Sequence, residues 1–311
     1  LLARAMTSDD TPAATEALDF TGERFTPECV REIWYEHMHR YAYAVDFCRG
    51  KRVLDAACGE GYGSALLAWT SASVLGLDVD AAAIAHARRR YSSRPGLSFQ
   101  QQDVTALDQL PDASFDVIVS FETLEHVHEQ ERMLAGFRRL LTADGVLLIS
   151  SPDKHTYSDL RDYRNEFHVR ELYRAELETL LQANFAHTRI YCQKLLFQSL
   201  LWDPDQPPSQ ARVSTLRSDG TVSARPDYQA LYFLAVCSAQ PLECVAPAGA
   251  LHLFGDAAET VYEHYNEEIR RIIAAGHRLI AQDQEIADLR ARLAHAEALL
   301  AEQAQHQGRK P

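Results

Sequence analysis

The chain has 311 residues, of which 46% are hydrophobic, and its formal net charge is -13. This length suits one large domain or a domain with an appendage, and the acidic balance disfavours binding to a long phosphate backbone, which needs clustered Lys and Arg. The six cysteines form no CxxC pair and no metal-ligand spacing, so we expect reduced thiols in a cytoplasmic protein. No apolar run reaches the roughly 18 residues that a membrane-spanning helix needs.

The first half of the chain alternates between strand-like and helix-like segments. Residues 1–19 lack the apolar core of a signal peptide and predict a disordered leader, and the aromatic-rich residues 28–48 predict a helix. Strands are predicted at residues 51–57, 73–79, 97–103, 115–121 and 145–152. Helices are predicted at residues 62–70, 80–91 and 129–141, the second with Asp80 as its N-cap. This alternation indicates an α/β fold with a doubly wound, mostly parallel sheet.

The pattern changes beyond the last of these strands. Residues 153–168 are polar and aromatic and predict a loop over the edge of the sheet, and residues 169–185 predict a helix. Residues 187–199 and 228–239 alternate like strands and predict an antiparallel pair that completes a seven-stranded sheet. Residues 203–227 are rich in Pro, Ser and Asp and predict a mobile insertion.

The C-terminal residues 258–305 contain no Pro, and their one glycine is Gly276. Aliphatic side chains recur there every seven residues, at Ile272, Leu279, Ile286, Leu293 and Leu300. Three residues after the first four of these stand Ala275, Gln282, Leu289 and Ala296. This heptad pattern predicts a coiled coil and therefore a homo-oligomer, most simply a homodimer. A single helix folded back on the main domain is the alternative, because several positions of the second set are weakly apolar. The expected boundaries are a leader at 1–19, a main domain at 20–240, a linker at 241–257 and the helix at 258–305.

The stretch CGEGYG, residues 58–63, is a glycine loop that closely follows a predicted strand. Glycines let a ligand approach the backbone closely, and the pyrophosphate of a dinucleotide is one candidate ligand. Asp55 in the strand and Glu60 in the loop would repel such a dianion. S-adenosylmethionine, which carries a sulfonium and an ammonium and has no phosphate, fits the two carboxylates better.

The segment VLDAACGEGYG, residues 53–63, resembles motif I of the class I S-adenosylmethionine-dependent methyltransferases. The matching positions are Asp55, Gly59, Gly61 and Gly63. Later segments resemble further motifs of the family in the same order: GLDVD at 76–80, QQDV at 101–104, FDVIVSFETLEHV at 115–127 and LLTADGVLLISSP at 140–152. The resemblance implies a Rossmann-like fold and S-adenosyl-L-methionine as the cofactor. Gly61 is expected to lie against the cofactor, so that a side chain there would fill the cofactor's space.

The resemblance also implies roles for single residues. Asp78 would accept hydrogen bonds from both ribose hydroxyls, and Asp103 would bind the adenine amino group. Val79, Val104 and Phe121 are expected to contact the cofactor as well. A dinucleotide held by the same glycine loop is the alternative.

A hydroxyl acceptor needs a general base, whereas a phosphate, carboxylate or free amine does not. Two histidines near the carboxyl ends of the strands are candidates. His126 follows the fourth predicted strand, and His168 lies in RNEFHVRE, which resembles an NPFHxxE signature of methyltransferases encoded among glycan-assembly enzymes, with Glu166 in place of the proline. Asp153 and Tyr157 are expected to contact the acceptor. No paired-acid motif indicates a metal site.

The stretches DFTGERFTPE and YEHMHRYAYA resemble the segment before motif I in the same glycan-associated group, where it packs over the cofactor. Arg24 is expected to hold the methionine carboxylate or an anionic acceptor. Glu36, His37 and Arg40 fall on one face of a helix. We expect this face to line the site, with Arg40 toward the cofactor and His37 toward the acceptor.

The expected function is O-methylation of a sugar or of an O-antigen-type glycan end, with residues 20–240 as the methyltransferase domain. A small aromatic or quinone-type acceptor is the alternative, because LEHV at 124–127 also resembles enzymes of that class. A third interpretation is a coiled-coil scaffold with an inactive methyltransferase site. The expected partners are the glycan acceptor and a second copy of the chain, or proteins of a glycan-assembly complex docked on the helix, and no nucleic acid.

Overall fold

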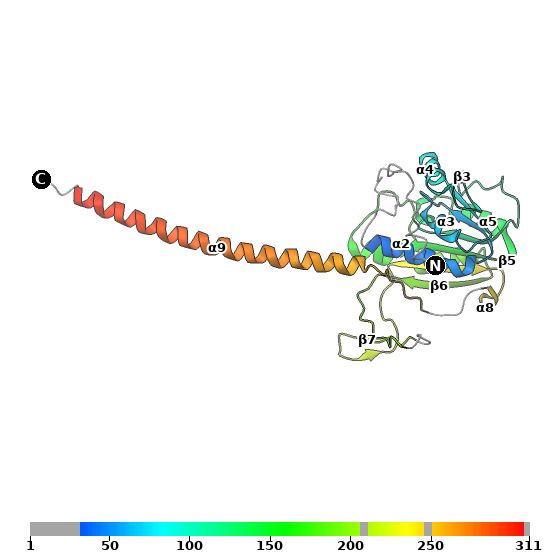
Figure 1. The fold of residues 1–311 in the computed structure, drawn as a ribbon. Helices are drawn as coiled ribbons and strands as arrows, with labels where there is room; N and C mark the ends of the chain where they lie inside the picture. Colours follow the sequence, from blue (N-terminus) through cyan, green and yellow to red (C-terminus); the bar gives the residue numbers. More distant parts are fainter. Residues whose placement is uncertain (1–31, 206–210, 246–250, 308–311) are drawn as a thin grey trace. The chain divides into compact units, whose positions relative to one another are not determined.

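The computed structural model describes residues 32–205, 211–245 and 251–307. The chain divides into two units, the first ending at Phe254 and the second beginning at Gly255. The first unit is built on a seven-stranded sheet, and the second holds one long helix (Figure 1).

The sheet has the strand order β3-β2-β1-β4-β5-β9-β6. Its strands are β1 (Arg52–Ala56), β2 (Ser73–Asp78), β3 (Leu97–Gln101), β4 (Phe115–Ser120), β5 (Leu141–Pro152), β6 (His187–Gln193) and β9 (Tyr232–Ser238). Neighbouring strands are parallel, except that β9 is antiparallel to β5 and β6. The predicted mostly parallel seven-stranded sheet is confirmed. The strand order reverses between β1 and β4, and ligands of such sheets bind at the carboxyl ends of the strands there.

Helices cover both faces of this sheet. They are α2 (Glu32–Cys48), α3 (Tyr62–Leu67), α4 (Ala81–Tyr91), α5 (Gln130–Leu140), α6 (Lys154–Tyr157), α7 (Arg174–Gln182) and α8 (Leu242–Val245), with 3-10 turns η1 (Leu124–His126) and η2 (Asp159–Arg161). Successive strand residues point to opposite faces, and Val53 and Leu54 accordingly enter different buried clusters. Val53 packs with Tyr41 of α2, and Leu54 packs with Phe137 of α5 and Leu181 of α7. Two apolar layers therefore hold the sheet between helices.

Local elements depart from the sequence prediction in three places. The helix expected over residues 169–185 begins only at Arg174, because the preceding residues are tied to η1 by backbone hydrogen bonds. The expected insertion at 203–227 contains a small hairpin of β7 (Thr215–Leu216) and β8 (Val222–Ser223). The segment expected as a linker contains α8, and its aromatic residues pack on α2: the rings of Phe254 and Trp34 lie 6.1 Å apart.

The second unit is dominated by α9, which runs from Thr260 to Gln307. Its length agrees with the helix predicted over residues 258–305. Within the described ranges, no helix combines the length and the apolar character needed to cross a bilayer.

Candidate active site

The glycine loop after β1 is held open by its own backbone and by β2. Gly59 and Gly61 have φ angles of 56° and 90°, which non-glycine residues adopt with strain. The amide of Gly59 donates to Oδ2 of Asp78 at 2.8 Å, and the amide of Asp80 donates to Oδ1 at 2.9 Å. The carboxylate of Asp78 therefore shapes the loop through its own hydrogen bonds, besides the ribose contact expected of it.

Two glycines of the motif are required by packing within the protein. A Cβ atom at Gly61 would lie 2.6 Å from the Phe99 ring and 2.9 Å from the Ala87 side chain. A Cβ atom at Gly63 would lie 2.0 Å from the Tyr41 ring. The expectation that a side chain at Gly61 would fill the cofactor's space is therefore wrong, since it would first meet the core between α4 and β3.

Asp55 lies beneath the loop and is fully buried. Its carboxylate accepts hydrogen bonds from the hydroxyls of Ser64 at 2.6 Å and Tyr41 at 3.1 Å. Burial raises the pKa of Asp55 to about 7, against the effect of these two hydrogen bonds. This acid is thus part of a closed polar group that joins β1, α2 and α3.

Glu60 does not face a ligand at the loop. Its carboxylate is 1% exposed and lies 3.0 Å from Nε2 of His86 and 3.4 Å from the Arg90 guanidinium. It also accepts from the Tyr91 hydroxyl at 3.1 Å. The expectation that Glu60 would repel a phosphate in the site is therefore wrong, because this side chain turns toward α4, where cationic and hydroxyl partners are found.

The other cofactor candidates follow the carboxyl ends of β2, β3 and β4. Val79 is 66% exposed, and the exposed carboxylate of Asp103 accepts from the amide and the hydroxyl of Thr105, both at 2.8 Å. Val104 is buried in the core. Phe121 is also buried, with its ring 5.0 Å from Tyr41. The topology thus brings Asp78 and Asp103 to neighbouring strand ends, and Phe121 lies across the switch point from them.

Arg40 is buried where α2 meets the carboxyl ends of β4 and β6. Its Nε donates to Gln193 at 2.8 Å, its NH2 group lies 3.4 Å from Glu122, and its guanidinium lies 4.5 Å from the centre of the Tyr232 ring. Neither terminal nitrogen has a hydrogen-bond acceptor among the described residues. Beside it, burial raises the pKa of Glu36 to about 7. Arg40 is thus a buried cation that keeps hydrogen-bonding capacity.

Two further candidates of the N-terminal stretch have different outcomes. The imidazole Nδ1 of His37 lies 3.1 Å from the Tyr62 hydroxyl, and burial lowers the pKa of His37 well below its ordinary range. This histidine thus lies beside the glycine loop, and the charge of Arg40 also lowers its pKa. Arg24 lies outside the described residues.

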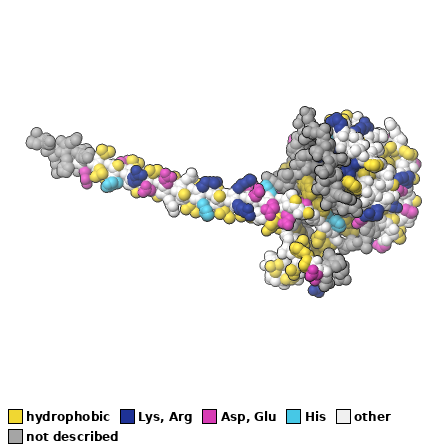
Figure 2. Space-filling view, viewed as in Figure 1, with side chains coloured by type: hydrophobic (Ala, Val, Ile, Leu, Met, Phe, Trp, Pro, Cys, Tyr) yellow, Lys and Arg dark blue, Asp and Glu magenta, His cyan; other side chains and the backbone are white. Residues whose placement is uncertain are grey.

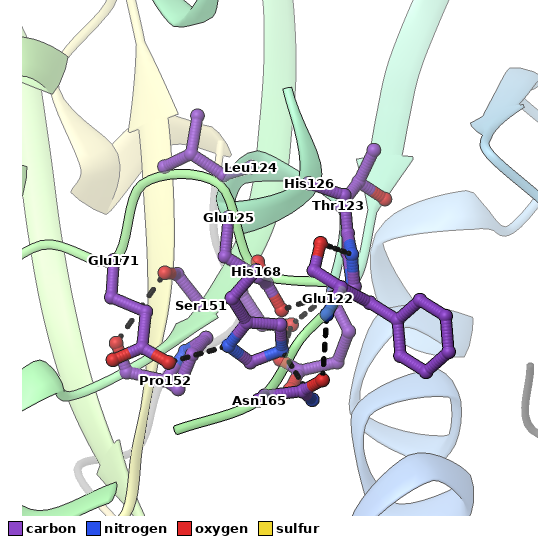
Figure 3. Close-up of polar contacts among 12 residues, drawn as sticks. Glu122, Thr123, Leu124, Glu125, His126, Ser151, Pro152, Asn165, His168 and Glu171 are labelled. Carbon is purple, nitrogen blue, oxygen red and sulfur yellow. Dashed lines mark hydrogen bonds and ion pairs between the residues drawn. The ribbon is translucent and has the colours of Figure 1, made fainter. Parts of the chain in front are cut away.

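The two predicted base candidates, His126 and His168, lie in contact although they come from different segments of the chain. Their rings lie edge to face with centroids 4.9 Å apart. Nδ1 of His126 donates to the Phe167 carbonyl at 3.0 Å. Nδ1 of His168 lies 2.5 Å from the Glu171 carboxylate, and its Nε2 lies 3.0 Å from the Asn165 amide nitrogen. Figure 3 shows His168 between these two partners.

Of the two residues predicted to contact the acceptor, Tyr157 lies in the histidine cluster and Asp153 does not. The ring of Tyr157 stacks on His168, with centroids 5.4 Å apart, so Tyr157 belongs to the cluster. Asp153 instead caps α6, where its side chain accepts from the amide of His155. Asp153 therefore stabilises the start of α6, and its predicted contact with an acceptor stays a prediction.

Sequence reasoning missed two acids of this cluster. Glu171 stands three residues after His168, at the final position of the RNEFHVRE stretch, and Glu125 directly precedes His126; these positions make both acids candidates but do not show their contacts. Glu125 is 1% exposed, and burial raises its pKa well above the ordinary range. Possible ligand atoms of Glu125, His126 and His168 all lie within 4.8 Å of one another, so these three residues could hold a divalent cation.

A cavity of about 250 Å³ opens beside Arg40, between α2, the end of β6 and residues 226–230. Its lining includes Glu36 and Arg40, and it is rich in aromatic rings, from Tyr35, Tyr43, Tyr191, Tyr228 and Phe254. The polar groups at its wall and the histidine cluster both lie at the carboxyl edge of the sheet. The structure thus brings the glycine loop, the histidine cluster and this cavity to one edge of the sheet.

The chain is similar in sequence to known methyltransferases. A family described as a methyltransferase domain matches residues 48–198. A Mycolicibacterium smegmatis protein named "Probable S-adenosylmethionine-dependent methyltransferase" is 41% identical over 177 residues, which are 56% of this chain and 67% of that protein. A Mycobacterium tuberculosis protein with the same description, Rv3030, is 39% identical over 180 residues, 56% of this chain and 64% of the relative. A ubiquinone biosynthesis O-methyltransferase of Pasteurella multocida is 34% identical over 113 residues, 33% of this chain and 46% of the relative.

The residues matched by the family model contain the glycine loop, Asp78 and Asp103. The regions shared with the relatives span about two thirds of the mycobacterial proteins and less than half of the ubiquinone enzyme. The chain belongs to the S-adenosylmethionine-dependent methyltransferases, with the Rossmann-like class I fold and S-adenosyl-L-methionine as its cofactor.

Proposed function

We propose that the chain transfers the methyl group of S-adenosylmethionine to a hydroxyl of a sugar or of a glycan end, with His168 as the general base. The observation that carries this proposal is the contact between His168 and Glu171. A carboxylate that accepts from Nδ1–H fixes the tautomer with Nε2 free of a proton, and such an imidazole can take a proton from an alcohol.

The reaction makes few other demands on the protein. The sulfonium donor is already activated, so the enzyme aligns the acceptor oxygen, the methyl carbon and the sulfur and excludes water. As the oxygen–carbon bond forms, the carbon–sulfur bond breaks, and the hydroxyl proton passes to Nε2 of His168. The Asn165 amide lies at that nitrogen in the structure, so we expect the acceptor hydroxyl to replace it.

The pocket beside Arg40 supports an acceptor that is both polar and ring-shaped. Aromatic rings offer flat apolar surface, and the buried Arg40 and Glu36 and the half-buried Gln193 offer hydrogen-bonding groups at one wall. A sugar with a charged substituent combines these features. A quinol or other small aromatic acceptor is the second candidate, favoured by the relative named as a ubiquinone biosynthesis O-methyltransferase.

The test is a methyl-transfer assay with labelled S-adenosylmethionine over nucleotide sugars, glycan ends and quinols. We expect labelled methyl ethers on a carbohydrate acceptor and none on the quinols. Label found only on quinols would overturn the sugar assignment, and label on an amine or carboxylate would overturn the need for a base.

The same assay with a chelator separates two uses of the histidine cluster. Turnover that survives the chelator supports His168 as a base. Turnover that is lost, and is restored by added Mg²⁺ or Mn²⁺, would reassign His126 and His168 as ligands of a cation that lowers the pKa of the bound hydroxyl.

A further inference from the structure

Helix α9 carries a row of large aliphatic side chains that are exposed in the described part of the chain. The row consists of Ile272, Leu279, Ile286, Leu293 and Leu300. Their side chains are between 44% and 69% exposed. Figure 2 shows hydrophobic side chains along the length of this helix among charged ones. A row with a seven-residue period is the seam that a second helix covers in a coiled coil.

The charges beside this seam indicate which helix covers it. With Ile272 as position a, the g positions of three successive heptads hold Arg278, Glu285 and Arg292 (the g residues). The e positions that follow hold Asp283, Arg290 and Glu297 (the e residues). In a parallel pair of identical helices in register, each g residue faces the e residue five positions later on the other helix. The three contacts are then Arg with Asp, Glu with Arg, and Arg with Glu, so every one joins opposite charges.

Other arrangements of two copies lose this match. An antiparallel pair centred on the middle heptad places Arg278 opposite Arg292, and Asp283 opposite Glu297. Two like charges thus meet on each side of the seam, which costs stability. An antiparallel pair that is shifted to avoid these contacts gives up part of the overlap and with it part of the apolar seam.

We propose that α9 pairs with α9 of a second copy of this chain as a parallel, in-register coiled coil. The seam residues bury one another, the g and e residues select the parallel register, and Ala275 and Ala296 at d positions let the helices approach closely. Gln282, at another d position, is a polar residue of the kind that fixes register. Both copies enter the coil from their Thr260 ends, so one dimer joins two methyltransferase domains.

Charge reversal in the full-length chain tests the register. One variant carries Arg278→Glu, Glu285→Arg and Arg292→Glu; the other carries Asp283→Arg, Arg290→Glu and Glu297→Arg. Each variant alone opposes like charges at every g–e contact, so we expect its dimer dissociation constant to rise at least 100-fold by sedimentation equilibrium. Mixed in equal amounts, the two variants restore opposite charges at every contact, and we expect a heterodimer close to the wild-type affinity.

A neighbouring pair of residues provides a matched control for the seam. Leu279 lies in the seam and Ile280 at the next position outside it, with 61% and 58% exposure. We expect Leu279→Asn to weaken the dimer at least 10-fold and Ile280→Asn to leave it unchanged.

Wild-type protein that is a monomer or a trimer by light scattering would overturn the proposal, and so would reversal variants that dimerise like wild type or fail to recover on mixing. Methyl transfer to a small acceptor is measured in parallel, because its loss concerns the proposed function and not the coil.

Discussion

Nδ1 of His168 lies 2.5 Å from Oε1 of Glu171, and both side chains are 8% exposed. A carboxylate in this position stabilises the imidazolium that forms when the base takes a proton, and it holds the ring at a fixed angle. The ring is held further by Tyr157, which stacks on it. In the proposed reaction, this pair would act as an oriented base at the carboxyl edge of the sheet.

We expect His168→Ala to lower kcat roughly 100-fold or more and to leave S-adenosylmethionine binding nearly unchanged, because removal of a general base acts on the chemical step. Methyl-transfer rates and isothermal titration measure the two quantities. His128→Ala is the control, since His128 is an exposed histidine two residues after His126, and we expect it to behave like wild type. If His126→Ala abolishes turnover while His168→Ala does not, the base is His126.

We expect Glu171→Gln to lower kcat less than the loss of His168 does, on the order of 10-fold, because the amide still holds the ring but no longer stabilises its cation. Binding of S-adenosylmethionine should stay unchanged, since the contact of Glu171 is with His168. Methyl-transfer rates and isothermal titration measure the two quantities. A variant with the kcat of wild type would show that Glu171 does not act through His168.

We expect Asp78→Ala to raise the dissociation constant of S-adenosylmethionine by roughly 10- to 150-fold, since a charge-assisted hydrogen bond contributes about 1.5–3 kcal/mol. The variant should also lose thermal stability, because the same carboxylate accepts from the amides of Gly59 and Asp80. Titration calorimetry and thermal unfolding measure both effects. Asp144→Ala on the exposed end of β5 serves as the control. Unchanged binding would remove Asp78 from the cofactor site.

The sequence predicts the sheet well because alternating apolar and amphipathic segments over residues 51–152 admit few other folds. It places Asp78 and Asp103 correctly at strand ends for the same reason. The errors concern side-chain direction: the loop spacing does not reveal that Glu60 turns to His86, or that Gly61 faces Phe99. Motif spacing alone also cannot show that Glu171 reaches His168, because their contact depends on a loop that is held to η1 by long-range backbone hydrogen bonds.

The last prediction concerns Asp55 and pH. Burial raises the pKa of its carboxyl from 3.8 to about 7 in the folded protein, while the unfolded chain keeps the ordinary value. Between these two values the folded state holds a proton that the unfolded state has lost, so the contribution of this group to stability falls as pH rises from about 4 to about 7 and is constant beyond. A shift of about three pKa units corresponds to at most about 4 kcal/mol.

We therefore expect the difference in unfolding free energy between wild type and Asp55→Asn to decline by up to this amount over that range, as measured by urea unfolding at several pH values. Asp108→Asn, at a carboxylate that is 88% exposed, should show no such decline. A difference that is independent of pH would mean that Asp55 is ionised in the folded protein, held by the hydroxyls of Ser64 and Tyr41.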